Sequence, residues 1–206
     1  YQSGDLQFID TVPTDEIAGL LDSPEFNIVD QLGTYYVTFN VKSGLFEGKT
    51  LAQANAMRKA MALLIDRGYI AENIGQTGQQ PANAFIPAKM MDGHGGEFKT
   101  NDADYTYPDE ATVGYFDPEY SDAAVDEAIA LLEEAGFTFT ADGMLDASTP
   151  IKFEYVTNES SAHVAIAEAI QQDLAVVGID MTIKTLEWSV FLNERKAGNF
   201  DVARNG

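Results

Sequence analysis

The residues that could perform covalent chemistry in this chain are few, and their types restrict the reactions it can support. Cysteine is absent from the 206 residues, which excludes a thiol nucleophile, a thiolate metal site and a disulfide framework. The two histidines are His94 and His163, and no Gly-x-Ser-x-Gly sequence supplies a nucleophile elbow. Acyl transfer therefore has no supporting pattern.

Carboxylates are abundant, but their spacings do not indicate catalysis. Glu133 and Glu134 are neighbours near the end of an expected helix, where a solvated surface is a more common role than a glycosidase acid pair. Residues 92–97 and 101–104 offer oxygen ligands for calcium or form solvated acidic loops, and neither has the alternation and closing Glu of an EF-hand. The glycines within residues 93–96 lack the Lys and Ser/Thr of a phosphate-binding loop. We expect no enzymatic activity, no metal and no cofactor.

The charge balance restricts the possible partners of the chain. Lys and Arg number 12 against 33 Asp and Glu, and the net charge of -21 disfavours a nucleic-acid backbone or an anionic membrane as partner. Arg204 follows a short apolar run at the end of an expected strand, which is an unusual position for one of so few cations. Arg195 by itself could be a surface residue. Arg204 is thus the first candidate for a ligand contact.

The elements that would position these residues lie in the last quarter of the chain. Ile151, Phe153 and Tyr155 alternate with polar residues, which is typical of a half-buried strand, and Gly178 follows a helical pattern as a C-cap. Two strands joined by a helix should run parallel through a right-handed crossover. The expected elements are a strand over 151–155, a helix over 161–177, a strand over 179–185, a short helix from residue 187 and a strand over 200–204.

The first 150 residues contain further helix and strand patterns. Thr50 and Gln53 form a capping box at the start of a strong helix, and Thr14 is an N-cap candidate for another. The helix after Thr50 has an apolar stripe of Leu51, Ala54, Met57, Met61, Leu64 and Ile65. The other expected elements are strands over 3–10, 26–30 and 34–40, a helix over 121–136, a hairpin turn at 142–143 and a loop-rich segment over 75–120.

Several of these motifs together resemble the oligopeptide-binding proteins of ABC importers, extracellular solute-binding protein family 5. The longest matching runs are NESSAHVAIAEAIQQ at 158–172 and FDVAR at 200–204. The shorter ones are residues 3–5, 13–15, 36–40, 57–67, 131–137, 177–179, 187–188 and 191–192. The resemblance implies an α/β fold, one lobe of a periplasmic-binding-protein-like type II fold, with a mixed β-sheet flanked by helices. We interpret residues 1–206 as a single lobe, the second of a two-lobe protein, excised from a longer chain.

The resemblance also implies a function. Proteins of this family hold an oligopeptide in a cleft between two lobes that close by a hinge, and they deliver it to ABC permease subunits. The expected partners are therefore an oligopeptide, the permease and the missing first lobe, and the expected location is extracytoplasmic, in the periplasm or as a cell-surface lipoprotein. Both crossovers between the lobes should place Tyr1 and Gly206 close together at the hinge.

Four residues match cleft-facing positions of the family. Trp188 matches an aromatic that lines a side-chain pocket, Arg195 and Arg204 match cations that compensate acidic side chains or the peptide carboxylate, and His163 matches a histidine that faces the cleft. Each has an ordinary alternative: Trp188 could be a core aromatic and His163 a solvent-exposed residue of the first helical turn.

Several ligands and functions are compatible with this fold. The same fold could bind a dipeptide, a metal chelate or an oligosaccharide, and it could serve sensing instead of import. An acidic secreted hydrolase is the alternative from another class. The family's acidic residue for the peptide amino group would follow the matched motif and is not within these residues. Since half a cleft encloses little, we expect the lobe alone to bind peptides weakly or not at all.

Overall fold

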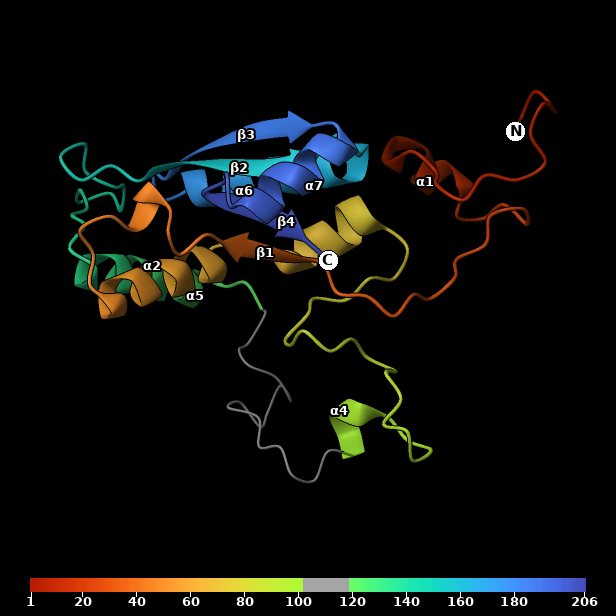
Figure 1. Cartoon of the computed structure of the whole chain (residues 1–206), viewed down its shortest axis with the longest axis horizontal. Coiled ribbons are helices and arrows are strands. Elements are labelled where there is room, and N and C mark those ends of the chain that lie inside the picture. The colour runs from red at the N-terminus through yellow and green to blue at the C-terminus, as the bar shows by residue number, and fades with distance from the viewer. Residues whose placement is uncertain (102–118) are drawn as a thin grey trace.

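A four-stranded mixed sheet organises the computed structural model, which describes residues 1–101 and 119–206 (Figure 1). The strand order is β1-β4-β2-β3, with β2 parallel to both β3 and β4, and with β1 antiparallel to β4. The strands are β1 (Tyr36–Phe39), β2 (Lys152–Asn158), β3 (Asp180–Leu186) and β4 (Val202–Asn205). The expected α/β class with a mixed sheet is confirmed.

The chain changes direction across the sheet at β2. From β2 it passes through α6 (Ser161–Ala175) to β3 on one side, and then through α7 (Trp188–Ala197) to β4 on the other side of β2. The two helices cover opposite faces of the sheet. Ile170 of α6 belongs to the main core, whereas Phe191 of α7 packs in a second cluster. Open α/β sheets generally bind ligands beside such a reversal, at the carboxyl ends of the strands.

The pairing of β2 differs between its two neighbours. β2 and β3 stay in register to the end of both strands, where Asn158 lies opposite Leu186. β2 and β4 pair only at Tyr155 with Val202 and at Val156 with Ala203. The carboxyl ends of β2 and β4 therefore separate after these two pairs.

The main core lies between the sheet and a pair of helices, α2 (Leu51–Leu63) and α5 (Asp122–Glu134). Met57 and Met61 are buried in it, which confirms their interpretation as core-filling residues. Leu51 was expected on the same apolar stripe, but it is 91% exposed. Leu51 is the first residue of α2, and the buried residues of this helix begin one turn later, at Ala54.

Both local helix signals around this core are confirmed. Thr50 Oγ1 accepts the backbone N–H of Gln53 at 3.2 Å, and Gln53 Oε1 accepts the backbone N–H of Thr50 at 3.0 Å. Gly136 ends the helix that Ser121 caps, and its φ of 90° suits the left-handed C-cap that glycine adopts without strain. The hairpin turn expected at 142–143 is present, with a bridge between Phe139 and Leu145.

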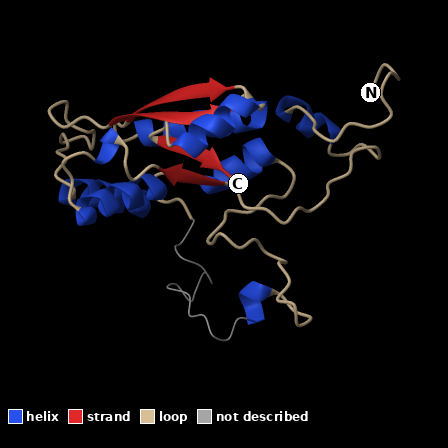
Figure 2. Cartoon of the chain, viewed as in Figure 1, coloured by secondary structure: helices blue, strands red, loops and turns tan. Residues whose placement is uncertain are grey.

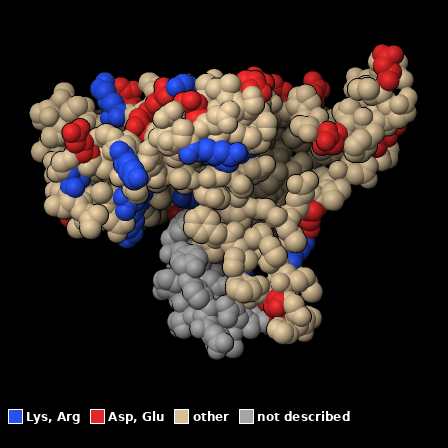
Figure 3. All heavy atoms as spheres, in the orientation of Figure 1, with Lys and Arg blue, Asp and Glu red and all other residues tan. Residues whose placement is uncertain are grey.

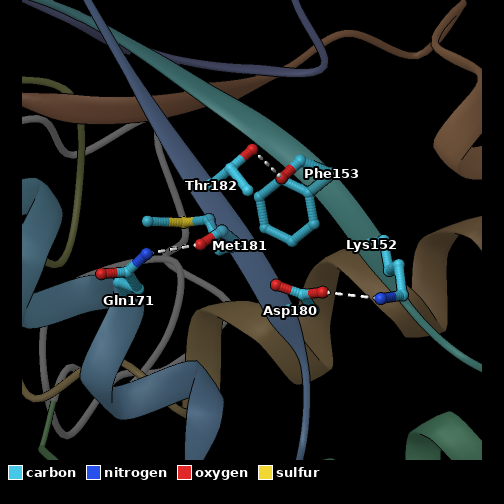
Figure 4. A network of polar contacts seen from close by, with 6 residues as sticks. All are labelled: Lys152, Phe153, Gln171, Asp180, Met181 and Thr182. Atoms are coloured by element: carbon cyan, nitrogen blue, oxygen red, sulfur yellow. Dashed lines mark hydrogen bonds and ion pairs between the residues drawn. The ribbon is translucent and has the colours of Figure 1, made fainter.

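Side chains tie the edge strand β3 to its neighbours (Figure 4). Gln171 of α6 donates from Nε2 to the carbonyl oxygen of Met181 at 2.6 Å. Lys152 Nζ and Asp180 Oδ2 form an exposed ion pair at 2.8 Å across the starts of β2 and β3. These contacts hold the β2–α6–β3 unit in one register.

The first 33 residues, here named the N-terminal arm, do not form the two strands that their patterns predicted. Residues 3–10 and 26–30 contain no strand, and the arm's one helix, α1 (Thr14–Leu20), buries no residue. Phe8 is 77% exposed and Val29 is 76% exposed. A strand needs a neighbouring strand for its backbone groups, and the described residues provide none here. The expected N-cap at Thr14 is also wrong: Thr14 is the first helical residue, and the cap at Pro13 has no side-chain hydrogen bond.

The two ends of the chain do not lie together as expected. Figure 1 places Tyr1 at the far end of the arm, well separated from Gly206. The residue beside Gly206 is instead Tyr35, because β1 pairs with β4 with Tyr36 opposite Asn205. The arm extends away from the sheet, so Tyr1 is distant from Gly206. The residue that adjoins Gly206 is Tyr35, which directly precedes β1.

The remaining elements are short and lie in loop-rich segments (Figure 2). They are η1 (Gly44–Phe46), α3 (Arg67–Tyr69), the π-helical turn η2 (Ile70–Gly75) and α4 (Phe98–Asn101). No helix among the described residues is long and apolar enough to cross a membrane.

Candidate functional site

The four residues predicted from the sequence meet at the carboxyl ends of the parallel strands. His163 lies in the first turn of α6, after β2, and Trp188 begins α7, after β3. Arg204 lies near the end of β4, and Arg195 lies in the last turn of α7. Segments that are 41 residues apart in the chain thus bring side chains together at the carboxyl ends of β2 and β4.

Arg204 and His163 form the central pair of this site. Arg204 Nη2 lies 2.8 Å from His163 Nε2. Since a guanidinium carries only N–H donors, His163 Nε2 must accept, which leaves the imidazole neutral with its proton on Nδ1. Burial, and then the positive charge of Arg204, lower the pKa of His163 to about 4. The pair therefore carries a single positive charge at neutral pH.

Aromatic rings surround the guanidinium of Arg204. Its Cζ lies 5.2 Å from the ring centre of Tyr35, 5.6 Å from that of Trp188 and 5.7 Å from that of Phe191. Such cation–π contacts hold a cation without neutralising it. Burial lowers the pKa of Arg204 from its ordinary value, and the positive charge of Arg195 lowers it further. The aromatic rings thus hold the Arg204 side chain in place, and no carboxylate of the described residues neutralises its charge.

Trp188 is presented at the surface by the cap of its helix. Glu187 Oε2 accepts the backbone N–H of Ser189 at 2.9 Å and that of Val190 at 3.3 Å, and it also accepts the hydroxyl of Ser189. These bonds lower the pKa of Glu187, so the cap is ionised. Trp188 is 46% exposed, so it is not a core residue. Its ring packs against the fully buried ring of Phe191, with the ring centres 5.9 Å apart.

Arg195 is held at the rim of the same site. Its Nη1 donates to Asn205 Oδ1 at 2.8 Å, and its Cζ lies 5.3 Å from the ring centre of Phe191. Phe191 is thus the common support under Trp188, Arg195 and Arg204. A buried ring that carries three site residues fixes their mutual geometry.

The positive charges of this site lack a counter-ion among the described residues. In the described part of the chain, every ion pair involves a lysine, and neither Arg195 nor Arg204 has a carboxylate within ion-pair distance. The amino end of α6 follows the carboxyl end of β2, and its N-cap Ser160 makes no side-chain capping hydrogen bond. Two guanidiniums and a free helix N-terminus together favour an anionic group, such as a carboxylate.

Two residues of the site were not predicted from the sequence. Tyr35 packs edge-on against His163 with ring centres 5.0 Å apart. Phe191 supports the site from within α7. The position of Tyr35 depends on the antiparallel pairing of β1 with β4, for which the local sequence contains no signal.

The acidic loops give no support to a metal site. Asp92 Oδ1 accepts the backbone N–H groups of His94 at 2.7 Å and Gly96 at 3.0 Å, so this carboxylate closes its own loop. Residues 102–104 of the second acidic segment lie outside the described residues. Within residues 1–101 and 119–206, no three His, Asp or Glu side chains gather closely enough to hold a metal ion.

Comparison with known proteins places this geometry in a family. Residues 1–206 match the family model described as bacterial extracellular solute-binding proteins, family 5 Middle. The dipeptide-binding protein DppE of Bacillus subtilis (strain 168) is 32% identical over 208 residues, which cover 100% of this chain and 33% of that protein. The periplasmic oligopeptide-binding protein OppA of Haemophilus influenzae is 31% identical over 216 residues, 100% of this chain and 34% of that protein.

The fold of this chain is also similar to that of a solved structure. The murein tripeptide binding protein MppA of Escherichia coli superposes with a TM-score of 0.74 at 27% identity, over 100% of this chain and 35% of that chain. The chain therefore spans about a third of the length of the proteins it matches.

Proposed function

The chain belongs to the bacterial extracellular solute-binding proteins of family 5, and on this premise we propose that it is one ligand-binding lobe of the substrate-binding component of an ABC importer, with oligopeptides as cargo. Its sheet, with the helices on both faces, forms the body of the lobe. The missing lobe of the same protein closes over the site, and the closed form is presented to the permease subunits. The family is extracellular, which agrees with the location expected from the sequence.

The observation that carries this proposal is the uncompensated Arg204 in a ring of aromatic side chains. A peptide offers an anionic terminus and, in many sequences, acidic side chains, and a guanidinium binds carboxylates with good geometry. The half-exposed Trp188 offers an apolar face beside the charge, which suits a peptide side chain of varied type. The named cargoes of DppE and OppA, dipeptides and oligopeptides, support the same class of ligand.

The exposure of the site supports a cleft shared by two lobes. Trp188 is 46% exposed and Tyr35 is 67% exposed, so two of the aromatic side chains around Arg204 face solvent. A ligand held by this lobe alone would keep much of its surface in water, and its affinity would be low. The second lobe supplies the enclosure that high affinity requires.

Calorimetric titration with peptides of two to five residues tests the proposal. The full-length protein is expected to bind, and the 206-residue chain is expected to bind at least about 100-fold more weakly. In the full-length protein, Arg204→Ala should lower the affinity about 30-fold or more, because a charge-assisted contact is lost. Lys152→Ala is the matched control, since it removes a cation from the opposite end of β2 and should leave the affinity unchanged.

Two results would count against the proposal. Full affinity of the Arg204→Ala variant would remove Arg204 from the ligand site. Absence of binding to every peptide by the full-length protein would exclude the peptide cargo while leaving the fold intact, and metal chelates and oligosaccharides would be tested next with the same two variants.

A further inference from the structure

The strand that carries Arg204 has little backbone pairing on the side of His163. β4 pairs with β2 over only two of its residues, Val202 and Ala203. Its longer pairing is with β1, but His163 follows β2, so the contact between Arg204 and His163 depends on the short pairing. A slip by one residue would turn Arg204 to the other face of the sheet. Another contact is therefore needed to fix β4 beside β2.

The carboxylate of Asp201 supplies this contact. Asp201 directly precedes β4, and its Oδ2 accepts the backbone N–H of Glu154 in β2 at 3.0 Å. Its Oδ1 accepts the hydroxyl of Ser43, which lies in the loop after β1. Its backbone carbonyl oxygen accepts the N–H of Asn40 at 2.8 Å. One partly buried residue thus joins the start of β4 to both neighbouring strands.

The side chain of Asn40 holds the connection between α7 and β4. Its Nδ2 donates to the carbonyl oxygen of Gly198 at 3.0 Å and to that of Phe200 at 2.9 Å. Gly198 is the C-cap of α7 and has a left-handed conformation with φ of 78°. Arg195 lies in the last turn before this connection, and Arg204 lies in the strand after it. Asn40 therefore fixes the two cations of the site relative to each other.

We propose that Asp201 and Asn40 are positioning residues of the ligand site, which fix β4 in the register that brings Arg204 against His163. Asp201 acts at a distance, since three residues of extended chain, about 10 Å, separate it from Arg204. A cation held in place before the ligand arrives raises affinity, because binding then costs less conformational entropy. The effect on affinity rests on the proposed function, whereas the effect on the pair of Arg204 and His163 does not.

Removal of the Asp201 carboxylate should separate Arg204 from His163 in the ligand-free protein. Asp201→Ala removes the acceptor for Glu154 and Ser43. The pKa of His163 should then rise from about 4 towards its ordinary 6.5, because the positive charge of Arg204 moves away. Asp201→Asn keeps an oxygen that accepts the N–H of Glu154 and an amide that donates to the hydroxyl of Ser43, so it should retain the low pKa.

A nuclear magnetic resonance titration of the full-length protein, with histidine isotope-labelled at Cε1, measures this pKa. His163→Gln identifies the signal of His163 by its disappearance. Asn40→Ala should raise the pKa in the same direction as Asp201→Ala, and it replaces that variant if Asp201→Ala does not fold.

Peptide affinity should respond to Asp201 only through Arg204. Calorimetry of the full-length protein uses the peptide of two to five residues that binds the wild type best. Asp201→Ala should lower the affinity about 10-fold, less than Arg204→Ala itself. In a protein that already carries Arg204→Ala, the same substitution should cause no further loss, because the cation that Asp201 positions is absent. A residue that only stabilised the fold would lower the affinity equally in both backgrounds.

Asp146→Ala is the matched control for the loss of a carboxylate. Asp146 Oδ1 accepts the backbone N–H of Ser148 at 2.8 Å and its hydroxyl at 2.6 Å, which are the same kinds of hydrogen bond, in a turn before β2. This variant should leave both the peptide affinity and the pKa of His163 unchanged.

Two results would overturn the positioning role. One is an unchanged pKa of His163 in the folded Asp201→Ala or Asn40→Ala variant. The other is an equal loss of affinity on Asp201→Ala with and without Arg204. If the wild type binds no peptide, the proposed function fails, and the histidine titration, which needs no ligand, still decides whether Asp201 positions Arg204.

Discussion

The N-terminal arm and the sheet differ in outcome although their sequences contain the same kind of strand pattern. Leu6 and Phe8 alternate with polar residues as Phe153 and Tyr155 do, yet the first pair is exposed and the second is buried. The second pair has β3 and β4 on either side of it, and the first has no neighbouring strand among the described residues. Alternation therefore shows which residues can form a strand, and the presence of a partner decides whether they do.

The two regions also differ in charge on the visible face. Figure 3 shows Lys and Arg side chains mainly over the sheet and its helices, while acidic side chains dominate the arm. No residue of the arm belongs to either core cluster. The arm should therefore contribute little to the stability of the sheet, and variants matched between the two regions test this comparison.

The largest expected effect is the loss of the buried ring of Phe191. Phe191→Ala should lower the free energy of unfolding by about 3–5 kcal/mol, because it leaves a cavity under α7 and removes the support of Trp188 and Arg195. Phe8→Ala in the arm removes a ring that is 77% exposed and should change the free energy of unfolding by less than about 0.5 kcal/mol. Urea unfolding followed by circular dichroism measures both, and similar losses in the two variants would contradict the comparison.

A smaller effect is expected at the helix caps. Thr50→Ala removes the side chain that accepts the N–H of Gln53 in the capping box, and should cost about 1 kcal/mol. Thr14→Ala, at the start of the arm's helix, removes no capping bond and should leave the free energy of unfolding unchanged or raise it by a few tenths of a kcal/mol, because alanine has the higher helix propensity. Chemical denaturation of the two variants decides the point, and an equal cost at Thr14 would show that α1 is an integral part of the fold.

The neutral state of His163 predicts a pH dependence of stability. Its pKa is lowered to about 4 in the folded protein, below the ordinary 6.5 of the unfolded chain. Between these values the unfolded chain binds more protons, so the free energy of unfolding rises with pH. The contribution of His163 to this free energy is lost as the pH falls from 6.5 towards 4. The contribution should be at most about 1 kcal/mol, because solvent screens the partly exposed imidazole.

Unfolding of the His163→Gln variant between pH 4 and 7 isolates this contribution. The variant should lose that part of the pH dependence, and His94→Gln, which changes an exposed histidine in a loop, should keep it. A His163→Gln variant with the pH profile of the wild type would mean that the imidazole is not held neutral by burial and by Arg204.

The smallest expected effect is that of removing the arm. Deletion of residues 1–33 should change the free energy of unfolding of the remaining chain by less than about 0.5 kcal/mol, because the deletion exposes no core residue. The same urea titration measures it. A loss of more than about 1 kcal/mol would show that the arm packs on the sheet in solution.

The sequence by itself determined the local elements and the residue types of the site. Period-two alternation predicted β2 and β3, the capping box predicted the start of α2, and glycines with positive φ ended the helices where expected. Arg204 could be singled out because of its position at the end of an expected strand, whereas Trp188, Arg195 and His163 were identified through the resemblance to the family. These signals succeed because they depend on backbone geometry and hydrogen bonds within a few residues.

Only the tertiary structure decided which patterns became a sheet and how the site was assembled. The sequence could not show that residues 3–10 have no neighbouring strand among the described residues, that Tyr35 lies against His163, or that β2 pairs with β4 over only two residues. Each of these depends on the strand order β1-β4-β2-β3, which joins segments more than a hundred residues apart. Pairing over such separations is set by competition among all strands for neighbours, and no local pattern records its outcome.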